Sequence, residues 1–284
     1  MTRALISPEE LKAALGHDIV VIDTRSPDDY AEKHIPGAVN MHEIFTFLAT
    51  STPEGMQELA DRFSAAFGAA GLDGKKMAVV YEQSMDTGFG QSCRGYFLLD
   101  YLGYPSIRVL HGGLKAWEAK GYPVTQDQPE IEAVEYHASA NATKTMLTKD
   151  DVKSALGRSD IALLDVRDVD EWIGDSSSPY GKDFCPRKGR IPGAKWIEWY
   201  RMMKPTETGP MIKSPDEILA ECASVGIAKE TPVYIYCFKG ARAANTFLAL
   251  KEAGLPDVQI YFGSWNEWSR DFDLPIEEGL PFDT

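Results

Sequence analysis

The chain carries an internal duplication, and this leaves only a few folds open to it. Three motifs each occur twice, in the same order along the two halves of the sequence. They are an apolar run that ends in Asp-x-Arg (19–25 and 161–167), the tetrapeptide Ile-Pro-Gly-Ala (35–38 and 191–194) and a Gly-x-x-x-x-Trp segment (112–117 and 263–268). Because the order is kept, we expect two copies of one structural unit.

Each copy has the pattern of an α/β unit. A helix capped by Ser7 or Thr148 precedes the apolar run, with an acidic partner three residues further on in each case. The apolar run itself is typical of a buried parallel strand. Further helices are expected at 90–102 and 241–253, each followed by a glycine and then by another strand. This alternation predicts two tandem units, each an open, mostly parallel sheet with helices on both faces.

The duplication also sets the expected domain boundaries. We expect a first domain over 1–125 and a second over 144–284, separated by a linker over 126–143. The linker segment is polar, is rich in Ala, Asn and Gln, and offers few large apolar side chains to a core. Its composition is therefore typical of a connection rather than of a third unit.

The overall charge excludes several classes of partner. The 284 residues include 29 Lys and Arg against 43 Asp and Glu, which gives a net charge of −14. A body this acidic is not expected to bind nucleic acid or an anionic membrane surface. The apolar runs are far shorter than the roughly 20 residues of a membrane span, and the N-terminus lacks the apolar core of a signal peptide. With four cysteines and no disulfide framework, we expect a reduced, cytoplasmic protein and a monomer.

One loop combines the features that stabilise an anion. The β-rich run 231–236 is followed by Cys237 and then, after Lys239 and Gly240, by the helical segment 241–253. The cysteine is therefore expected in a tight turn at the carboxyl end of a parallel strand, where open α/β sheets hold ligands. Gly240 permits a positive φ that turns successive N–H groups inward, and the helix adds the partial positive charge of its N-terminus. A bound anion or the cysteine thiolate would be stabilised there.

The second half of the chain contains no histidine to act as a base. The five histidines are His17, His34, His42, His111 and His137. A cysteine–histidine dyad of the protease type would need a residue from the other domain, which disfavours acyl transfer. We therefore assign thiolate formation to the helix terminus and to two cations of the loop, Lys239 and Arg242.

These motifs resemble the two-domain rhodanese family, the thiosulfate and 3-mercaptopyruvate sulfurtransferases. The two copies, the Asp-x-Arg strand ends, Ile-Pro-Gly-Ala, the Cys-Phe-Lys-Gly loop and the Gly-Ser-Trp-x-Glu-Trp segment cover nearly the whole chain in order. The resemblance implies that Cys237 accepts a sulfane sulfur as a persulfide and passes it to cyanide or a thiol. It also implies that loop amides surround the persulfide, namely those of Phe238, Lys239, Gly240, Ala241 and Arg242.

The first copy lacks this nucleophile. Glu82 stands at the position that corresponds to Cys237, in a longer loop. A carboxylate cannot take up sulfur, and it would repel an anionic substrate. Both the chemistry and the resemblance therefore predict an inactive first domain and a catalytic second one.

The resemblance favours thiosulfate as the donor. Lys239 falls where thiosulfate-specific members carry a lysine, which implies that it binds the sulfonate oxygens. Members that use 3-mercaptopyruvate have a small, uncharged Cys-Gly-x-Gly loop, which differs from the loop here. Both kinds keep an arginine where this chain has Glu171, and we expect Arg242, which replaces a small polar residue, to supply that positive charge.

Three alternatives stay open. 3-Mercaptopyruvate is the alternative donor, and a protein partner in a persulfide relay is the alternative to a small acceptor. The third is a cysteine phosphatase, whose Cys-(x)5-Arg loop is one residue longer than the Cys-(x)4-Arg loop found here. A shorter ring of amides suits a single sulfur better than a phosphate, so the phosphatase is the least favoured of the three.

The second copy carries an insertion of about 14 residues before its Ile-Pro-Gly-Ala motif. The segment 182–204 holds seven basic and two acidic residues, a local charge of +5. We expect Arg187, Lys188 and Arg190 to lie beside the Cys237 pocket and to attract a dianionic donor. A solvated basic loop is the alternative.

The other cysteines are not assigned a role in the chemistry. Cys93 and Cys222 lie in apolar helical segments and are expected to be buried structural thiols, whereas Cys185 of the insertion is expected to be exposed. Neither a zinc-like cluster of Cys and His nor a Gly-rich nucleotide loop occurs in the sequence. We therefore expect neither a metal nor an organic cofactor.

Overall fold

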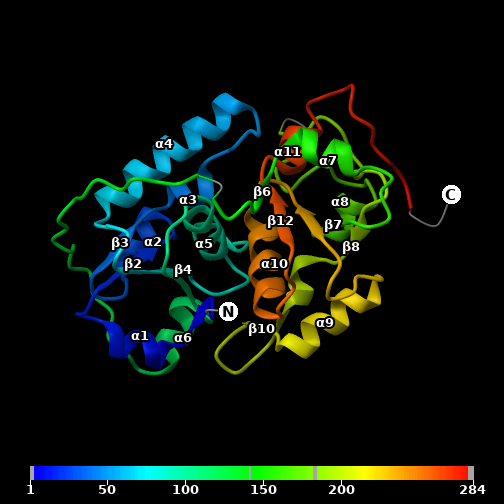
Figure 1. Cartoon of the computed structure of the whole chain (residues 1–284). Coiled ribbons are helices and arrows are strands. Elements are labelled where there is room, and N and C mark those ends of the chain that lie inside the picture. Colours follow the sequence, from blue (N-terminus) through cyan, green and yellow to red (C-terminus); the bar gives the residue numbers. More distant parts are fainter. Residues whose placement is uncertain (1–2, 141, 182–183, 281–284) are drawn as a thin grey trace. The chain divides into compact units, whose positions relative to one another are not determined.

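The computed structural model describes residues 3–140, 142–181 and 184–280 of the chain. By its internal contacts the chain divides into two compact units, which follow the two halves of the sequence (Figure 1). Each unit also takes a short segment from the other half. Leu48–Met56 belongs to the second unit, and Met203–Ile212 belongs to the first.

The first unit is built on a parallel sheet of five strands in the order β1-β5-β4-β2-β3. The strands are β1 (Leu5–Ile6), β2 (Ile19–Asp23), β3 (Ala38–Asn40), β4 (Met77–Tyr81) and β5 (Ile107–Leu110). The helices are α1 (Pro8–Ala14), α2 (Pro27–Glu32), α3 (Glu43–Thr46), α4 (Pro53–Ala69), α5 (Gln91–Tyr101) and α6 (Gly113–Ala119). The exchanged segment adds an antiparallel pair, β9 (Met203–Lys204) and β10 (Met211–Ile212).

The second unit repeats this topology. Its parallel strands follow the order β6-β12-β11-β7-β8, which matches the first unit strand for strand. The strands are β6 (Met146–Leu147), β7 (Ala162–Asp165), β8 (Lys195–Trp196), β11 (Val233–Tyr236) and β12 (Val258–Tyr261). The helices are α7 (Lys149–Ala155), α8 (Val169–Trp172), the 3₁₀ helix η1 (Trp199–Met202), α9 (Pro215–Ser224), α10 (Ala241–Glu252) and α11 (Ser264–Trp268). The duplication in the sequence is therefore a duplication of the fold.

The predicted helix starts are confirmed at the level of single hydrogen bonds. Ser7 accepts from the Glu10 N–H, and the Glu10 carboxylate accepts from the Ser7 N–H in return. Thr148 and Asp151 form the same reciprocal box at the start of α7. Such boxes satisfy N–H groups that have no partner inside the helix, so both copies begin their first helix in the same way.

The sheet of the second unit buries both of its faces. Tyr236 of β11 is completely buried in a core that also contains Val152 of α7 and Trp265 of α11. Successive strand residues point to opposite faces, so the neighbouring Ile235, which is also completely buried, points to the other side. α10 packs against β11 and β12 (Figure 1). The middle strand is thus fixed from both sides, and it ends at Cys237.

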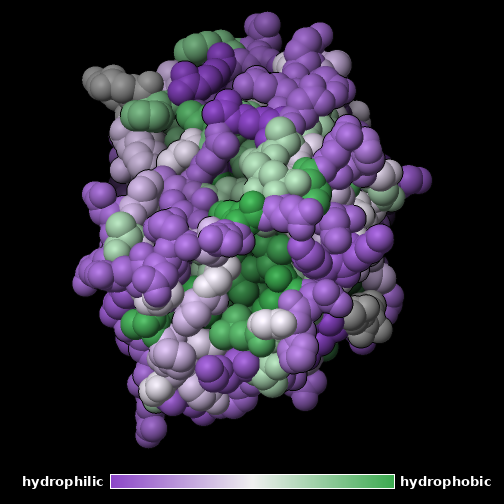
Figure 2. Space-filling model, turned by 90° about the vertical axis from the view of Figure 1, so that its left-hand side faces the viewer, coloured by the Kyte–Doolittle hydropathy of each residue, from purple (hydrophilic) through white to green (hydrophobic). Residues whose placement is uncertain are grey.

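Hydrophilic side chains predominate on the face shown in Figure 2, where hydrophobic ones gather in a hollow near the middle.

Among the described residues, no helix is both long enough and apolar enough to cross a membrane.

Candidate active site

Cys237 occupies the predicted position at the carboxyl end of a central parallel strand. It directly follows β11, which pairs with β7 on one side and with β12 on the other. The Cys237 N–H donates to Ser264 Oγ over 3.3 Å, and its carbonyl oxygen accepts from the Trp265 N–H over 3.0 Å. The Phe238 carbonyl oxygen accepts from the Asn266 N–H, also over 3.0 Å. The first turn of α11 therefore holds the loop from behind.

Gly240 directs a backbone amide at the sulfur. Its N–H donates to Cys237 Sγ over 3.1 Å, and the residue adopts φ +90° as the N-cap of α10. An added Cβ would lie 2.7 Å from two ring carbons of Phe262, so the position requires glycine for its space as well as for its backbone angle. The thiol is 1% exposed and lies at the positive end of α10. This geometry favours negative charge on the sulfur.

Arg242, in the first turn of α10, forms a buried ion pair. Its Nη1 and Nη2 atoms lie 2.6 and 3.0 Å from the two carboxylate oxygens of Glu171, and Nη1 lies 3.1 Å from Asp168 Oδ1. Burial lowers the pKa of Arg242, but Glu171, Cys237 and Asp168 outweigh it, and the pKa is raised above its ordinary value. The guanidinium lies near Cys237, and the carboxylates of Glu171 and Asp168 balance its positive charge. The two departures from the family pattern, at 171 and 242, are thus partners.

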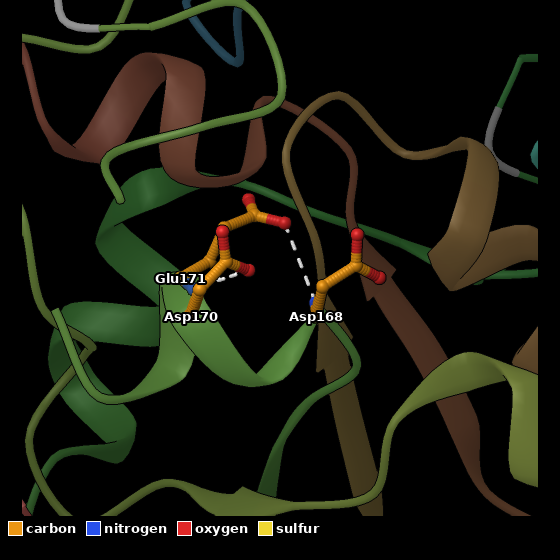
Figure 3. Close-up of side chains that lie close together, drawn as sticks. All are labelled: Asp168, Asp170 and Glu171. Carbon is orange, nitrogen blue, oxygen red and sulfur yellow. Dashed lines mark hydrogen bonds between the residues drawn. The ribbon is translucent and has the colours of Figure 1, made fainter. Parts of the chain in front are cut away.

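The same ion pair accounts for an acidic cluster at the start of α8. Asp168, Asp170 and Glu171 bring carboxylate oxygens within 4.8 Å of one another, a spacing at which a metal ion could be held (Figure 3). Glu171 also accepts from the Asp168 N–H, and Asp170 accepts from the Glu171 N–H. Since Arg242 already provides a positive charge between two of these carboxylates, we do not assign a cation to them.

The Asp-x-Arg motif of the second unit braces the end of the neighbouring strand. Arg167 pairs with both carboxylate oxygens of Asp165, donates to the Gly189 carbonyl oxygen over 2.8 Å and lies 4.5 Å from the centre of the Trp265 ring. Tyr236 donates from its hydroxyl to Asp165 over 2.6 Å. This network is buried and ties β7, β11 and the insertion together beside the cysteine loop.

Two arginines of the insertion are committed to structural contacts. Arg187 donates to four carbonyl oxygens within 3.0 Å, those of Trp268, Ser269, Asp271 and Leu274. Arg190 donates to the Gly279 and Trp172 carbonyl oxygens and pairs with Glu277. These bonds anchor the insertion to the C-terminal segment.

Lys188 of the insertion is exposed, and its ammonium group donates to the Asp175 carbonyl oxygen. Lys182 and Asp183, which the sequence analysis counted among the charges of the insertion, lie outside the described residues. An electrostatic role for these cations stays a prediction.

Aromatic side chains of the insertion lie over the loop, a feature that sequence reasoning missed. The Tyr180 ring centroid is 5.1 Å from that of Phe238 and 5.4 Å from that of Phe184. Lys239 Nζ lies 5.4 Å from the centre of the Tyr180 ring. The sequence signal was slight: Phe184 lies inside the segment 182–204 that was singled out for its charge, and Tyr180 lies just before it.

The duplicated sheets and the cysteine loop match a known family. The model of the rhodanese-like domain matches residues 7–120 and again residues 148–271. The chain belongs to the rhodanese family. A thiosulfate sulfurtransferase of Azotobacter vinelandii is 30% identical over 274 residues, which cover 96% of each chain.

Other relatives of this rhodanese carry different names. A 3-mercaptopyruvate sulfurtransferase of Escherichia coli is 26% identical and covers 90% of this chain and 87% of its own. A sulfur carrier protein, TtuD of Thermus thermophilus, is 27% identical, with 97% and 93% covered. Among solved structures, wild-type EanB has a TM-score of 0.83 and 26% identity and covers 98% of this chain and 70% of its own. These relatives support a general sulfurtransferase activity and differ in the donor or role that they name.

The first rhodanese unit holds a carboxylate where the second holds its thiol. Glu82 follows β4, is completely buried and accepts from Ser92 Oγ over 2.5 Å. Gly90, with φ +79°, caps α5 as Gly240 caps α10, but nine residues separate strand from helix here against four in the second unit. Burial raises the pKa of Glu82 to about 7. A carboxylate contains no sulfur, so the position of the first unit that corresponds to Cys237 offers no thiol.

The structure corrects one expectation about the other cysteines. Cys93 and Cys222 are buried, as predicted. Cys185 is not exposed: it is 0% exposed within the core of the second unit, and burial raises the pKa of its thiol. The basic residues around it suggested a solvated loop, but Arg187 and Arg190, which follow it in the chain, hold the insertion by hydrogen bonds to backbone carbonyl groups.

Proposed function

We propose that the chain is a thiosulfate sulfurtransferase that carries sulfane sulfur as a persulfide on Cys237. The observation that supports this most directly is the Gly240 N–H aimed at Cys237 Sγ over 3.1 Å. An amide fixed in that direction stabilises negative charge on the sulfur without an adjacent base. A solved structure of an EanB variant with a cysteine persulfide has a TM-score of 0.84 to this chain at 25% identity.

The proposed cycle is a double displacement. The Cys237 thiolate attacks the outer sulfur of thiosulfate, the sulfur–sulfur bond of the donor breaks, and sulfite leaves with the bonding electron pair. Cyanide or a thiolate then attacks the outer sulfur of the persulfide, the new carbon–sulfur or sulfur–sulfur bond forms, and the Cys237 thiolate is regenerated. Loop amides of Phe238 to Arg242 hold the sulfur in this proposal, and Lys239 binds the sulfonate.

Mass spectrometry of the intact protein tests this proposal. Incubation with thiosulfate and removal of the donor should leave one added sulfur atom, which peptide mapping should place on Cys237. Cys237→Ser should abolish both the added sulfur and the turnover with cyanide. Cys222→Ser, which changes another buried thiol of the same unit, should keep both. Sulfur found on another residue, or none at all, would refute the assignment.

3-Mercaptopyruvate is the second candidate donor, and the Arg242–Glu171 pair favours it. With Asp168 and Glu171 beside Arg242, two carboxylates face one guanidinium, which weakens the attraction for a dianion. The same mass spectrometry with 3-mercaptopyruvate in place of thiosulfate decides between the two. Faster persulfide formation from 3-mercaptopyruvate would replace the first proposal.

A protein acceptor is the alternative to cyanide or a thiol, and the resemblance to a sulfur carrier protein supports it. If small acceptors alone sustain turnover, a relay partner is not required. If the persulfide forms but small acceptors remove it only slowly, the relay is favoured.

We also propose that Arg187, Lys188 and Arg190 of the insertion attract the anionic donor to the site. Neutralising Arg187, Lys188 and Arg190 should weaken the salt dependence of kcat/KM for thiosulfate. Arg187 also braces the insertion, so Arg187→Lys, which keeps the charge and loses most of the donors, separates charge from structure. An unaltered salt dependence would rule out the electrostatic role.

A further inference from the structure

The insertion of the second unit forms an aromatic wall, made of Tyr180 and Phe184, against Phe238 of the loop. The Tyr180 ring packs on both phenylalanines at centroid distances of 5.1 and 5.4 Å. The ammonium nitrogen of Lys239 lies 5.4 Å from the centre of the same ring. One ring therefore contacts the residues on positions 238 and 239, directly after the nucleophile.

Hydrogen bonds from side chains to the backbone hold the wall in place. Ser178 Oγ accepts from the Tyr180 N–H over 3.2 Å and donates to the Gly181 carbonyl oxygen over 3.1 Å. The Arg270 guanidinium donates to the Phe184 carbonyl oxygen. The Tyr180 side chain is 44% exposed, so it stands at the surface of the loop rather than in the core.

A lysine side chain gains most from such support. Its four-carbon stem has many rotamers, and binding of the ammonium group to an anion in one place restricts it to few of them, which costs conformational entropy. The face of an aromatic ring carries negative charge density and attracts an ammonium group. The ring of Tyr180 thus restricts Lys239 before a donor arrives.

We propose that Tyr180 is a positioning residue, which holds the Lys239 ammonium group beside the cysteine loop for binding of the donor's sulfonate. The inference rests on the proposed function, because it assumes an anionic sulfur donor at Cys237. Arg242 already pairs with Glu171 and Asp168, so we expect Lys239 to be the cation of the loop that binds such a donor.

The test compares the two half-reactions of Tyr180 variants. Tyr180→Leu should lower kcat/KM for thiosulfate about fivefold, which corresponds to about 1 kcal/mol, because the cation–ring contact is lost. The kcat/KM for cyanide should stay unchanged, as should the rate at which neutral iodoacetamide alkylates Cys237. Tyr180→Phe, which keeps a ring, should retain most of the wild-type value. Tyr180→Gln gives a second, polar replacement if the leucine variant folds poorly.

A matched control and a double variant complete the test. Tyr200 is 42% exposed, and its ring is tilted against that of Trp199 at a centroid distance of 4.3 Å, so Tyr200→Leu should leave kcat/KM for thiosulfate unchanged. In a Lys239→Met background, Tyr180→Leu should cause no further loss, because its effect acts through the lysine.

The outcomes separate the inference from the function on which it rests. If the wild-type protein forms no persulfide with thiosulfate, both are overturned. If the persulfide forms but Tyr180→Leu reacts like the wild type, only the positioning role is overturned. The same holds if Tyr180→Leu causes an equal loss in the presence and absence of Lys239.

Discussion

Replacement of Gly240 by alanine tests the amide that points at the sulfur. The residue adopts φ +90°, and an L-residue in the left-handed region costs about 1–2 kcal/mol. The added Cβ would also lie 2.7 Å from Cδ2 and Cε2 of Phe262, far inside contact distance, so the ring or the loop must move. We expect the free energy of unfolding to fall by more than the backbone term alone.

The rate of sulfur transfer should also fall in Gly240→Ala, and by more than partial unfolding of the variant would explain. The loss of one preorganised donor to a developing negative charge typically costs a factor of ~10²–10³ in rate. Displacement of the Gly240 N–H from its 3.1 Å contact with Cys237 Sγ removes such a donor. We therefore expect kcat for thiosulfate and cyanide to drop about a hundredfold in a protein that is still folded at the assay temperature.

Gly157 provides the matched control for this experiment. It adopts φ +76° after α7, and an added Cβ would meet no atom within 4 Å. Gly157→Ala should therefore show the backbone cost of about 1–2 kcal/mol in urea unfolding and keep the wild-type rate. If Gly240→Ala keeps wild-type kcat while its unfolding free energy falls like that of Gly157→Ala, the amide does not stabilise the sulfur and the reasoning is refuted.

Three further predictions concern charged groups. Arg242→Gln leaves Glu171 buried without its partner and should cost about 3–5 kcal/mol in urea unfolding, whereas adding Glu171→Gln should recover part of that loss; an equal loss in the double variant would contradict this. Burial raises the pKa of Glu82 from its ordinary 4.5 to about 7, so the folded state resists ionisation, and stability should fall by about 3 kcal/mol as the pH rises from about 4.5 to about 7. Glu82→Gln should flatten that slope, and an unchanged unfolding profile would refute the assignment. Lys239→Ala should lower kcat/KM for thiosulfate more than for an uncharged donor, while equal losses would remove Lys239 from sulfonate binding.

The periodic and local features of this fold can be predicted from the sequence. The capping boxes at Ser7 and Thr148 are encoded within four residues, and the helix after Gly240 ends at Glu252, one residue before its predicted limit. The position of Cys237 follows from the strand, the glycine and the helix that surround it in the chain. Such features depend on neighbours along the sequence, so a single sequence is sufficient to find them.

Side-chain partners across the fold could not be predicted in this way. The sequence did not indicate that Arg242 pairs with Glu171, which lies 71 residues away in the chain and accepts from both terminal nitrogens of the guanidinium. Cys185 was expected in water because its neighbours are basic, and those neighbours instead bury it by binding backbone carbonyl groups. The composition of a segment gives its net charge, but the fold determines which carboxylate and carbonyl oxygen atoms its basic side chains contact.

The hydrogen bonds between α11 and the cysteine loop have a consequence for how an incoming anion is received. In a planar trans peptide the C=O and the N–H point in opposite directions. The carbonyl groups of Cys237 and Phe238 both turn toward α11, so the N–H groups of Phe238 and Lys239 must turn away from it. The short helix α11 contacts the rear of the loop and thereby determines which side of the loop presents N–H donors. Substitutions in α11 should therefore change the rate of sulfur transfer.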